Sequence, residues 1–517
     1  MILLSFIFIL ITGGICFGAT LYVATDGNDS NPGTQSLPFE TIQKAVDAAS
    51  NGDTILVEEG TYFEDVIVGK DRLTLRSLTT LGATIDGSSF AIGLTGNGIT
   101  VEDFTIENST NGIVVSGDQT EDVTISSNWF SVIEDDGIRF DYNAAIDGCT
   151  VTIDDNFIFS SDNYGIYMAG EMGLLQDVDI RILDNLVDGA SDGIWFNYLF
   201  GGSVEISDNN LYDCYTSGIY IDETEPFGES VSFKIENNTI DLAGTSGSYG
   251  IFMNNAERTT WVNGNTVTGG YDSGIHIQHL GLFGSDPLLV YVDENTISGC
   301  EWGIYLDRLF EDLSGSIYLR KNVISDCTSG TWGDGDGIHL KYIGYSSAAS
   351  GFNLYCEENT IFGCDDDGLE FEEIFYGSTG DIEVQRNNFI DNAYGLYIYE
   401  ETFLENSTLV VENNNFEGQG DLGLYNNTDV LINAQNNWWG DETGPFDPSD
   451  TGDNPSYDNP GGLGDQVSEY VDYDPWRDSP YIAGEESSGG CNTGGFDPAL
   501  IFLILPLLGL FSLKRNR

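Results

Sequence analysis

Basic residues are scarce in this chain, and their scarcity excludes several classes of partner. The sequence holds 17 Lys and Arg against 84 Asp and Glu, a formal net charge of −67. Nucleic acids and anionic membrane surfaces are bound through basic patches, so the chain is expected to bind neither. A surface this acidic favours solubility, and clustered carboxylates also suit Ca²⁺. Both interpretations stay open from composition alone.

Cysteine and histidine patterns typical of metal sites are also missing. Cys16 and Cys491 lie near the ends of the chain, and the other six cysteines show no Cys-x-x-Cys spacing. Those six are Cys149, Cys214, Cys300, Cys327, Cys356 and Cys364. We expect them to be buried as small apolar residues, although an exported protein can also form disulfides. The three histidines, His276, His279 and His339, do not form a ligand set by spacing.

Asparagine and glycine recur at nearly regular intervals. An Asn follows a short alternating apolar stretch, and a Gly that opens a second apolar stretch comes after it. The Asn positions are Asn128, Asn156, Asn185, Asn209, Asn238, Asn265, Asn295, Asn322, Asn359, Asn387, Asn414 and Asn437. The Gly positions are Gly112, Gly137, Gly165, Gly193, Gly218, Gly250, Gly274, Gly303, Gly337, Gly368, Gly395 and Gly423. Such periodicity indicates a repeat architecture.

The repeat predicts one coil of parallel strands per unit. Apolar and polar residues alternate, as in strands with one buried face, and the strands are too short for a helix-connected sheet. Asn tolerates the left-handed backbone of a sharp turn, and its amide can bond the Asn of the next coil. Gly permits a positive φ or a close approach of two backbones. We therefore expect stacked coils with an internal Asn ladder.

Both ends of the repeat are marked by composition. Ile42, Ala45, Val46 and Ala49 have helical spacing and predict a short N-terminal capping helix, which Gly52 can end. Residues 53–57, 60–62 and 66–68 are expected to be the first strands. Proline is nearly absent from the repeat but occurs six times between residues 440 and 481, where coiling must stop.

The two termini have the composition of processing and anchoring signals. Residues 2–17 are almost wholly apolar and are followed by small residues, which predicts a signal peptide. Near the other end, Cys491 follows Ser and Gly residues, and an apolar run and four residues rich in Lys and Arg come after it. The run is just long enough to cross a bilayer. We expect export to the cell surface or outer envelope, with the tail either retained as an anchor or removed.

The predicted organisation has six parts. They are a signal peptide (1–19), an N-terminal cap with the first coils (20–111), parallel β-helix repeats (112–440), a Pro-, Gly- and Asp-rich closing segment (441–482), a Gly/Ser linker with Cys (483–495), and a hydrophobic sorting or transmembrane tail (496–517).

Several of these segments resemble known families. Leu21 to Thr34, Pro38 to Gln43, Gly52 to Ile55 and Gly60 to Tyr62 resemble the opening of the pectin-lyase-like proteins, and Asn436 to Gly440 resembles a closing segment of bacterial surface members. The tail after Ser487 resembles bacterial C-terminal sorting tails of the Synergist and Myxococcus types. The resemblance implies an all-β fold, a right-handed single-stranded parallel β-helix of about a dozen coils. It implies no single activity, because the fold hosts lyases, hydrolases, esterases and adhesins.

In enzymes of this fold the substrate commonly lies along the strand that here begins at the repeated Gly. The residue two after that Gly is expected to point outward. This row is Val114, Arg139, Tyr167, Trp195, Tyr220, Phe252, His276, Tyr305, His339, Glu370, Tyr397 and Tyr425. Since sugar rings stack on aromatic faces, the candidate sugar-binding residues are Tyr167, Trp195, Tyr220, His276, Tyr305 and Tyr397. Strand propensity and contacts between coils would produce the same pattern.

The next outward row, four residues after each Gly, is mostly polar and can furnish hydrogen bonds to a glycan. It is Asp141, Ala169, Asn197, Asp222, Asn254, Gln278, Asp307, Lys341, Glu372 and Tyr399. A solvated strand edge is the alternative interpretation.

Titratable residues concentrate on two neighbouring repeats. Asp334, Asp336, His339 and Lys341 lie on one, and Asp365, Asp366, Asp367, Glu370 and Glu372 lie on the next. Asp336 and Asp367 both precede the repeated Gly, so they are expected about 5 Å apart on adjacent coils. Candidate catalytic residues are Asp336, Asp367, Glu370 and His339, because paired carboxyls can perform glycosidic acid–base chemistry. Asp336, Asp366 and Asp367 can alternatively bind calcium, or all can be acidic turn residues facing water.

The acidic stretch matches the pattern of one enzyme family only in part. The Asp-rich stretch is similar to the polygalacturonase pattern, but the Gly-His-Gly and Arg-Ile-Lys that complete that pattern are absent. A lyase would need a basic residue, for which Arg139, Arg308 and Lys341 are candidates. We therefore expect a surface-anchored protein that binds extracellular carbohydrate. A polysaccharide lyase or glycoside hydrolase, and a structural envelope protein without a ligand, are the alternatives.

Overall fold

The computed structural model describes residues 18–141, 144–169, 175–197, 199–222, 231–242, 249–254, 259–280, 287–310, 314–331, 334–344, 351–374, 380–400, 402, 407–448 and 458–482. The chain divides into two compact units, Met1–Tyr481 and Ile482–Arg517. The predicted signal peptide as far as residue 17, and the predicted linker and tail from residue 483, lie outside the described residues.

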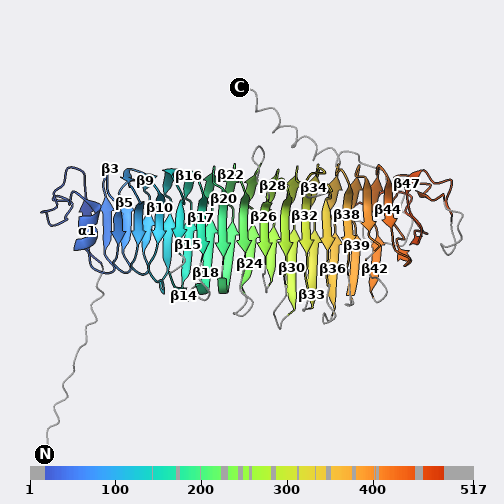
Figure 1. Cartoon of the computed structure of the whole chain (residues 1–517), viewed down its shortest axis with the longest axis horizontal. Coiled ribbons are helices and arrows are strands. Elements are labelled where there is room, and N and C mark those ends of the chain that lie inside the picture. Colours follow the sequence, from blue (N-terminus) through green and yellow to red (C-terminus); the bar gives the residue numbers. More distant parts are fainter. Residues whose placement is uncertain are drawn as a thin grey trace, which may run out of the picture. The chain divides into compact units, whose positions relative to one another are not determined.

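Each repeat forms one coil of three short strands, and the strands of successive coils lie side by side (Figure 1). One coil contains β30 (Leu288–Asp293), β31 (Thr296–Ser298) and β32 (Trp302–Asp307). In the next coil, β33 (Gly315–Arg320), β34 (Val323–Ser325) and β35 (Ile338–Lys341) pair with them in parallel. The buried side chains Ile297 and Ile324 face each other across this register.

The strands belong to three long sheets. Sheet 1 has eighteen strands, from β1 (Thr20–Val23) to β48 (Val471–Asp472), and sheet 2 has fourteen, from β3 (Gly60–Tyr62) to β43 (Asn415–Glu417). Sheet 3 has fourteen strands: β4 (Val66–Val68), β7 (Phe90–Leu94), β10 (Asn111–Val115), β13 (Ile138–Phe140), β17 (Tyr164–Ala169), β20 (Asp192–Asn197), β23 (Ser217–Asp222), β26 (Tyr249–Asn254), β29 (Ser273–Gln278), β32, β35, β38 (Asp367–Glu372), β41 (Tyr394–Ile398) and β44 (Leu422–Asn426). The predicted right-handed parallel β-helix is confirmed.

The predicted Asn ladder runs through the coils between sheets 1 and 2. All twelve Asn side chains are buried, and each of the first eleven donates from Nδ2 to Oδ1 of the next at 2.9–3.1 Å. Each also donates to a backbone carbonyl, as Asn295 does to Val262 at 2.8 Å. The ladder satisfies buried polar groups that would otherwise oppose folding.

The left-handed residue of each turn is not the ladder Asn, so this part of the prediction is wrong. Positive φ occurs one residue earlier, at Ser127, Asp155, Asp184, Asp208, Asn237, Gly264, Glu294, Lys321, Glu358, Arg386, Asn413 and Asn436, with φ of 53–65°. The chain turns at this residue, and the side-chain amide of the following Asn then points into the coil. The conformation is open to Asp, Asn and other residues at a modest steric cost.

The repeated Gly is required by close approach rather than by a positive φ. At Gly303, an added Cβ would lie 2.4 Å from the carbonyl oxygen of Gly337 and 2.4 Å from Cγ2 of Ile324. Neither the backbone of the next coil nor the core side chain can yield that space. The Gly therefore sets the corner between sheets 2 and 3.

The predicted N-terminal helix is α1 (Ile42–Ala48), which buries Ile42, Ala45 and Val46. It ends at Ala49 and not at Gly52. Thr41 caps its start, and Glu64 accepts hydrogen bonds from the backbone N–H groups of the first two helical residues. The predicted first strands are present as β2 (Thr54–Val57), β3 and β4. Within the described residues, no helix is long and apolar enough to span a membrane.

At the other end the chain folds against the last coil. Trp439 is buried and stacks on Phe416 at 4.7 Å between ring centroids. The short strands β46 (Pro445–Phe446) and β47 (Gly464–Gln466) pair there, and the buried Tyr473 hydroxyl donates to Asp447 Oδ2 at 3.0 Å. Among the described residues, the six internal cysteines are all buried free thiols, as expected.

The Asn ladder gives a direct test of what holds successive coils in register. We predict that Asn209→Ala lowers the free energy of unfolding by about 2–4 kcal/mol, because the backbone N–H and side-chain amide of Asn185 lose their acceptor in a buried site. Asn210→Ala, one residue along the same turn but half-exposed, is the matched control and should change it by less than about 1 kcal/mol. Urea unfolding followed by circular dichroism measures both. Equal effects would show that the ladder adds nothing specific.

Candidate functional site

Sheet 3 carries the predicted aromatic row on its outer face. The residues two after each Gly occupy matching positions on successive strands, from Val114 through Tyr425. Ring centroids lie 4.6–6.2 Å apart along Tyr167, Trp195, Tyr220 and Phe252, and the row continues through His276, Tyr305 and His339. The guanidinium of Arg139 lies over Tyr167, which extends the stack at its start.

The rings of this row cover one another's faces. The angles between successive ring planes from Tyr167 to Phe252 are 4°, 2° and 16°. A sugar cannot stack on a ring face that another ring already occupies, so this stretch offers edges and polar atoms only. Phe252 and His276 are also buried, at 5% and 7% exposure. Burial lowers the pKa of His276 to about 3, and neither ring nitrogen has a hydrogen-bond partner.

A second row on the same face was not predicted. Four of the residues before the repeated Gly are aromatic and contact the ring three positions later: Tyr164 with Tyr167, Tyr249 with Phe252, Trp302 with Tyr305 and Tyr394 with Tyr397. Strict strand alternation would place these residues inside. The recurrence of Tyr or Trp three residues before an outward aromatic residue is the sequence signal that reveals the row.

The predicted polar row lies beside the rings and is largely engaged with itself. Asn254 donates to Asp222 at 2.8 Å, and Lys341 Nζ lies 2.6 Å from Glu372 Oε1. The three basic residues suggested for a lyase are all in ion pairs: Arg139 with Asp136 and Asp141, Arg308 with Asp307, and Lys341 with Glu372.

The aromatic row is interrupted at β35 and β38, where the structure brings the predicted titratable residues together. His339 pairs in register with Glu370, and Lys341 with Glu372. His339 Nδ1 lies 2.8 Å from Asp336 Oδ2 and 2.8 Å from Glu370 Oε2. His339 Nε2 lies 3.1 Å from Glu372 Oε2. We call Asp336, His339, Asp367, Glu370 and Glu372 the acidic cluster.

The second buried carboxyl of the cluster belongs to Asp367. Its backbone N–H donates to Asp336 Oδ1 at 3.1 Å, so the two predicted carboxylates do lie on adjacent coils. Asp336 and Asp367 are 0% and 4% exposed, and Asp367 Oδ1 has no hydrogen-bond partner. Asp334 and Asp365 lie apart from this group, where Ser329 donates from its backbone to Asp365 and from its hydroxyl to the Asp334 carbonyl.

Burial and like charge shift the proton affinities of the cluster. Burial raises the pKa of Asp367 well above its usual range, and Asp336 and Glu370 add to the effect. Burial also raises the pKa of Glu370, and it raises that of Asp366 to about 6 with help from Asp336. Burial alone would lower the pKa of His339, but its contacts with three carboxylates raise it well above the usual value. Burial opposes ionisation of Glu372, yet His339 and Lys341 hold the Glu372 pKa below its usual value.

One combination in the cluster has the spacing of metal ligands. Asp336, His339 and Glu370 each offer one ligand atom, and these atoms lie within 4.8 Å of one another. This set contains His339, whereas the sequence suggested an all-carboxylate calcium site of Asp336, Asp366 and Asp367. His276 does not join it, because Tyr305 lies between His276 and His339 in the row.

Sheet 1 carries a further set of side chains that was not predicted. Trp261, Tyr291, Tyr318 and Tyr355 form a stack with interplanar angles of 6–10°. Beside it, a hollow of about 330 Å³ is lined by Asp293, Glu294, Arg320, Lys321, Glu357 and Glu358. The signal for both is periodic, since the rings lie four residues before the ladder Asn and the charged residues two and one before it.

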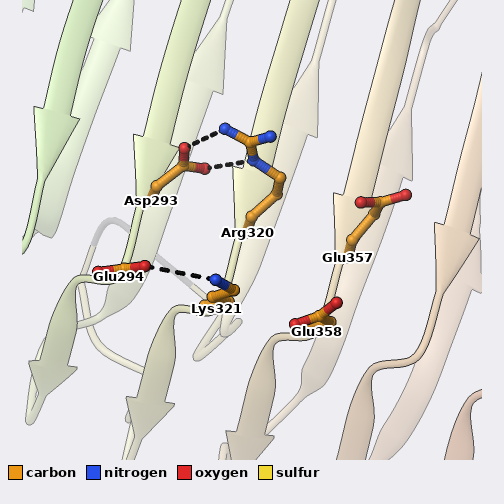
Figure 2. A pocket seen from close by; sticks show the side chains of 6 residues that line it. All are labelled: Asp293, Glu294, Arg320, Lys321, Glu357 and Glu358. Carbon is orange, nitrogen blue, oxygen red and sulfur yellow. Dashed lines mark hydrogen bonds and ion pairs between the residues drawn. The ribbon is translucent and has the colours of Figure 1, made fainter. Parts of the chain in front are cut away.

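The charges of this hollow are balanced within the protein. Figure 2 shows Asp293 paired with Arg320 and Glu294 paired with Lys321. Glu357 and Glu358 are paired with Arg386 of the following coil, at 3.0 and 3.5 Å. The hollow is therefore explained by ion pairs between coils, and the acidic cluster of sheet 3 is the better candidate site.

Comparison with known proteins agrees with the fold. The family model described as right handed beta helix region matches residues 91–282, and that of a protein of unknown function, DUF1565, matches residues 25–69. The uncharacterized protein YwoF of Bacillus subtilis (strain 168) is 38% identical over 79 residues, which are 14% of this chain and 17% of that protein.

Solved structures of the same general kind are distant. The GH136 lacto-N-biosidase from Eubacterium ramulus matches at 13% identity and a TM-score of 0.33, over 77% of this chain and 67% of that chain. The catalytic unit of GH87 alpha-1,3-glucanase from Streptomyces thermodiastaticus strain HF3-3 matches at 13% identity and a TM-score of 0.35, over 85% and 66%. Pectate lyase Pel9A matches at 13% identity and a TM-score of 0.21, over 78% and 80%. These values are too low to transfer an activity to this chain.

Asp192 offers a test of buried charge on this face outside the acidic cluster. It precedes Gly193, is 7% exposed, has an unpartnered Oδ1, and burial raises its pKa to about 6. The folded state thus binds its proton more tightly than the unfolded state, whose Asp pKa is about 3.9, so stability falls as pH rises between these values. We predict that Asp192→Asn stabilises the protein at pH 7 by about 1–3 kcal/mol and that the gain disappears below about pH 4.

Thermal unfolding at pH 4 and pH 7 measures this effect, with Asp162→Asn as the control because Asp162 is exposed on a neighbouring coil. A gain of the same size at both pH values would contradict the assignment of the cost to a buried ionised carboxylate.

Proposed function

We propose that the protein binds an extracellular polysaccharide on the outer face of sheet 3, centred on β32 to β41. One observation carries the proposal: the stack of rings is interrupted at the acidic cluster. Trp302 and Tyr305 lie on one side of the interruption and Tyr394 and Tyr397 on the other, all partly exposed. Between them, Glu370 takes the place of a ring in the row.

The interruption combines the two kinds of contact that sugars need. Glu370 lies between His339 and Tyr397 and carries no ring, so no ring of the row covers Tyr397 on the Glu370 side. Lys341, Glu372 and Glu370 retain side-chain exposures of 25%, 19% and 12%, enough to reach sugar hydroxyl groups. Rings with a few convergent polar groups are typical of carbohydrate sites. The net charge of −67 favours a neutral glycan over an acidic one.

The proposed location follows from the termini. An apolar stretch at residues 2–17 and a Cys-containing linker before an apolar, basic-ended tail favour export and retention at the cell surface. A site for extracellular polysaccharide is consistent with that location.

Cleavage of the glycan is a second candidate, favoured by two carboxyl groups in contrasting surroundings. Glu372 is held by Lys341 and His339, as an ionised base or nucleophile would be. The largest electrostatic influences on Asp366 come from other carboxylates, as suits a proton donor. Glycosidases divide acid and base roles between such groups.

Affinity electrophoresis of the full-length protein in mild detergent tests binding. We predict that gels containing a neutral polysaccharide retard the wild type, and that Trp302→Ala and Tyr397→Ala each weaken the interaction about tenfold. Tyr318→Ala, in the ring stack of sheet 1, is the matched control and should migrate like the wild type. Equal weakening by all three variants would place the binding surface elsewhere, and free migration in every gel would leave the structural interpretation.

The same gels, stained for intact polysaccharide, test cleavage. Clearing by the wild type that is lost in Asp366→Asn would make the protein an enzyme. Retardation without clearing would leave a binding protein, and clearing that persists in Asp366→Asn would exclude Asp366 as the proton donor.

A further inference from the structure

His339 has two ring nitrogens but faces three carboxylate acceptors. Its Nε2 lies 3.1 Å from Glu372 Oε2, and the other oxygen of that carboxylate is 2.6 Å from Lys341 Nζ. A carboxylate held by an ammonium group is an acceptor only, so Nε2 carries a hydrogen and donates it to Glu372. In the neutral ring, Nδ1 is then a bare lone pair.

That lone pair faces two further acceptors. Asp336 Oδ2 and Glu370 Oε2 are both 2.8 Å from His339 Nδ1. A proton on Nδ1 can lie on the line to one of these oxygens but not to both. Ligand atoms bonded at about 2.1 Å to one ion are about 3–3.4 Å apart, slightly wider than the 2.8 Å from His339 Nδ1 to each oxygen. A cation between the three atoms removes the repulsion among all of them.

Asp367 supplies an independent indication of a missing positive charge. It is 4% exposed, its Oδ1 has no hydrogen-bond partner, and its backbone N–H donates to Asp336 Oδ1 at 3.1 Å. In the hollow of sheet 1, carboxylates are paired with Arg or Lys of an adjacent coil, as Asp293 is with Arg320. Here Lys341 pairs with Glu372, which leaves Asp336, Asp367 and Glu370 around a single imidazole. An unpartnered buried carboxylate is costly unless it binds a cation.

We propose that Asp336, His339 and Glu370 bind one divalent transition-metal ion, such as Zn²⁺ or Mn²⁺, with the negative charge of Asp367 beside it. Imidazole nitrogen together with carboxylate oxygen suits these ions, whereas Ca²⁺ takes six to eight oxygen ligands. Glu372 orients the ring from its other nitrogen, the usual arrangement for a metal-bound histidine. The ion holds β35 and β38 together whether or not the surface binds a glycan.

Metal titration of the full-length protein in detergent tests the site. After chelator treatment and dialysis, Zn²⁺, Mn²⁺ and Ca²⁺ are added separately and followed by calorimetry and thermal unfolding. We predict one Zn²⁺ or Mn²⁺ per chain with a rise in melting temperature, and weaker binding of Ca²⁺. Co²⁺ in the same site should give a visible absorption spectrum that is altered in His339→Gln.

Variants separate a metal ligand from a packing residue. His339→Gln should weaken Zn²⁺ binding at least about 100-fold, and Glu372→Gln, which keeps all three ligands, about 10–100-fold. His276→Gln, a buried ring of the same row without polar partners, should bind Zn²⁺ like the wild type. If His339→Gln fails to fold, Glu372→Gln and Asp367→Asn carry the test.

Three outcomes would overturn the proposal. A folded wild type that binds none of the three ions would mean that an imidazolium ring occupies the position between the carboxylates. Ca²⁺ binding in preference to Zn²⁺ and Mn²⁺ would mean an all-oxygen site. Unchanged Zn²⁺ affinity in Glu372→Gln and Asp367→Asn would place the ion elsewhere.

Discussion

The hydrogen bond that passes from one buried Asn amide to the next fixes the register of the coils, and the rest of the structure depends on that register. Each ladder residue bonds the next coil through both its side chain and its backbone N–H, as Asn295 does to Asn322. A coil that slipped by one residue would lose these bonds and turn its apolar side chains outward. Variable segments of different length can therefore leave each coil between sheets 3 and 1 without disturbing its neighbours.

Fixed register also determines where chemistry can occur. Residues of the same kind at the same position of successive coils contact one another at about 5 Å, the spacing between strands. Rings then cover rings, as in Tyr167, Trp195 and Tyr220, and opposite charges neutralise one another, as in Asp293 and Arg320. In a row of matching residues, the side chains pair with one another, and few ring faces or charges remain for a ligand. Free binding capacity arises where a row changes character, and in sheet 3 that change falls at His339 and Glu370.

The sequence was sufficient to predict the fold because the ladder Asn and the repeated Gly each recur once in every coil. It also predicted that Asp336 and Asp367 would lie on adjacent coils, since both precede that Gly. It did not predict that Asp336 would contact His339 three residues later, because the corner breaks the strict alternation of a strand. The sequence also did not predict that Phe252 and His276 would be buried, since the exposure of an outward-pointing residue depends on its neighbours in space. The ring stack of sheet 1 was periodic and was simply not sought.

Sheets 1 and 3 differ in how completely their charged side chains are paired. In sheet 1 the residues directly before the ladder Asn alternate in sign along four coils: Glu294, Lys321, Glu358 and Arg386. Of the 17 basic residues of the chain, Arg320, Lys321 and Arg386 form these ion pairs. The acidic cluster, by contrast, contains the buried Asp336 and Asp367, and Lys341 beside it pairs with Glu372. Because burying unpaired carboxylates destabilises the fold, their concentration around His339 is best explained by a positively charged or hydrogen-bonding ligand that completes the site.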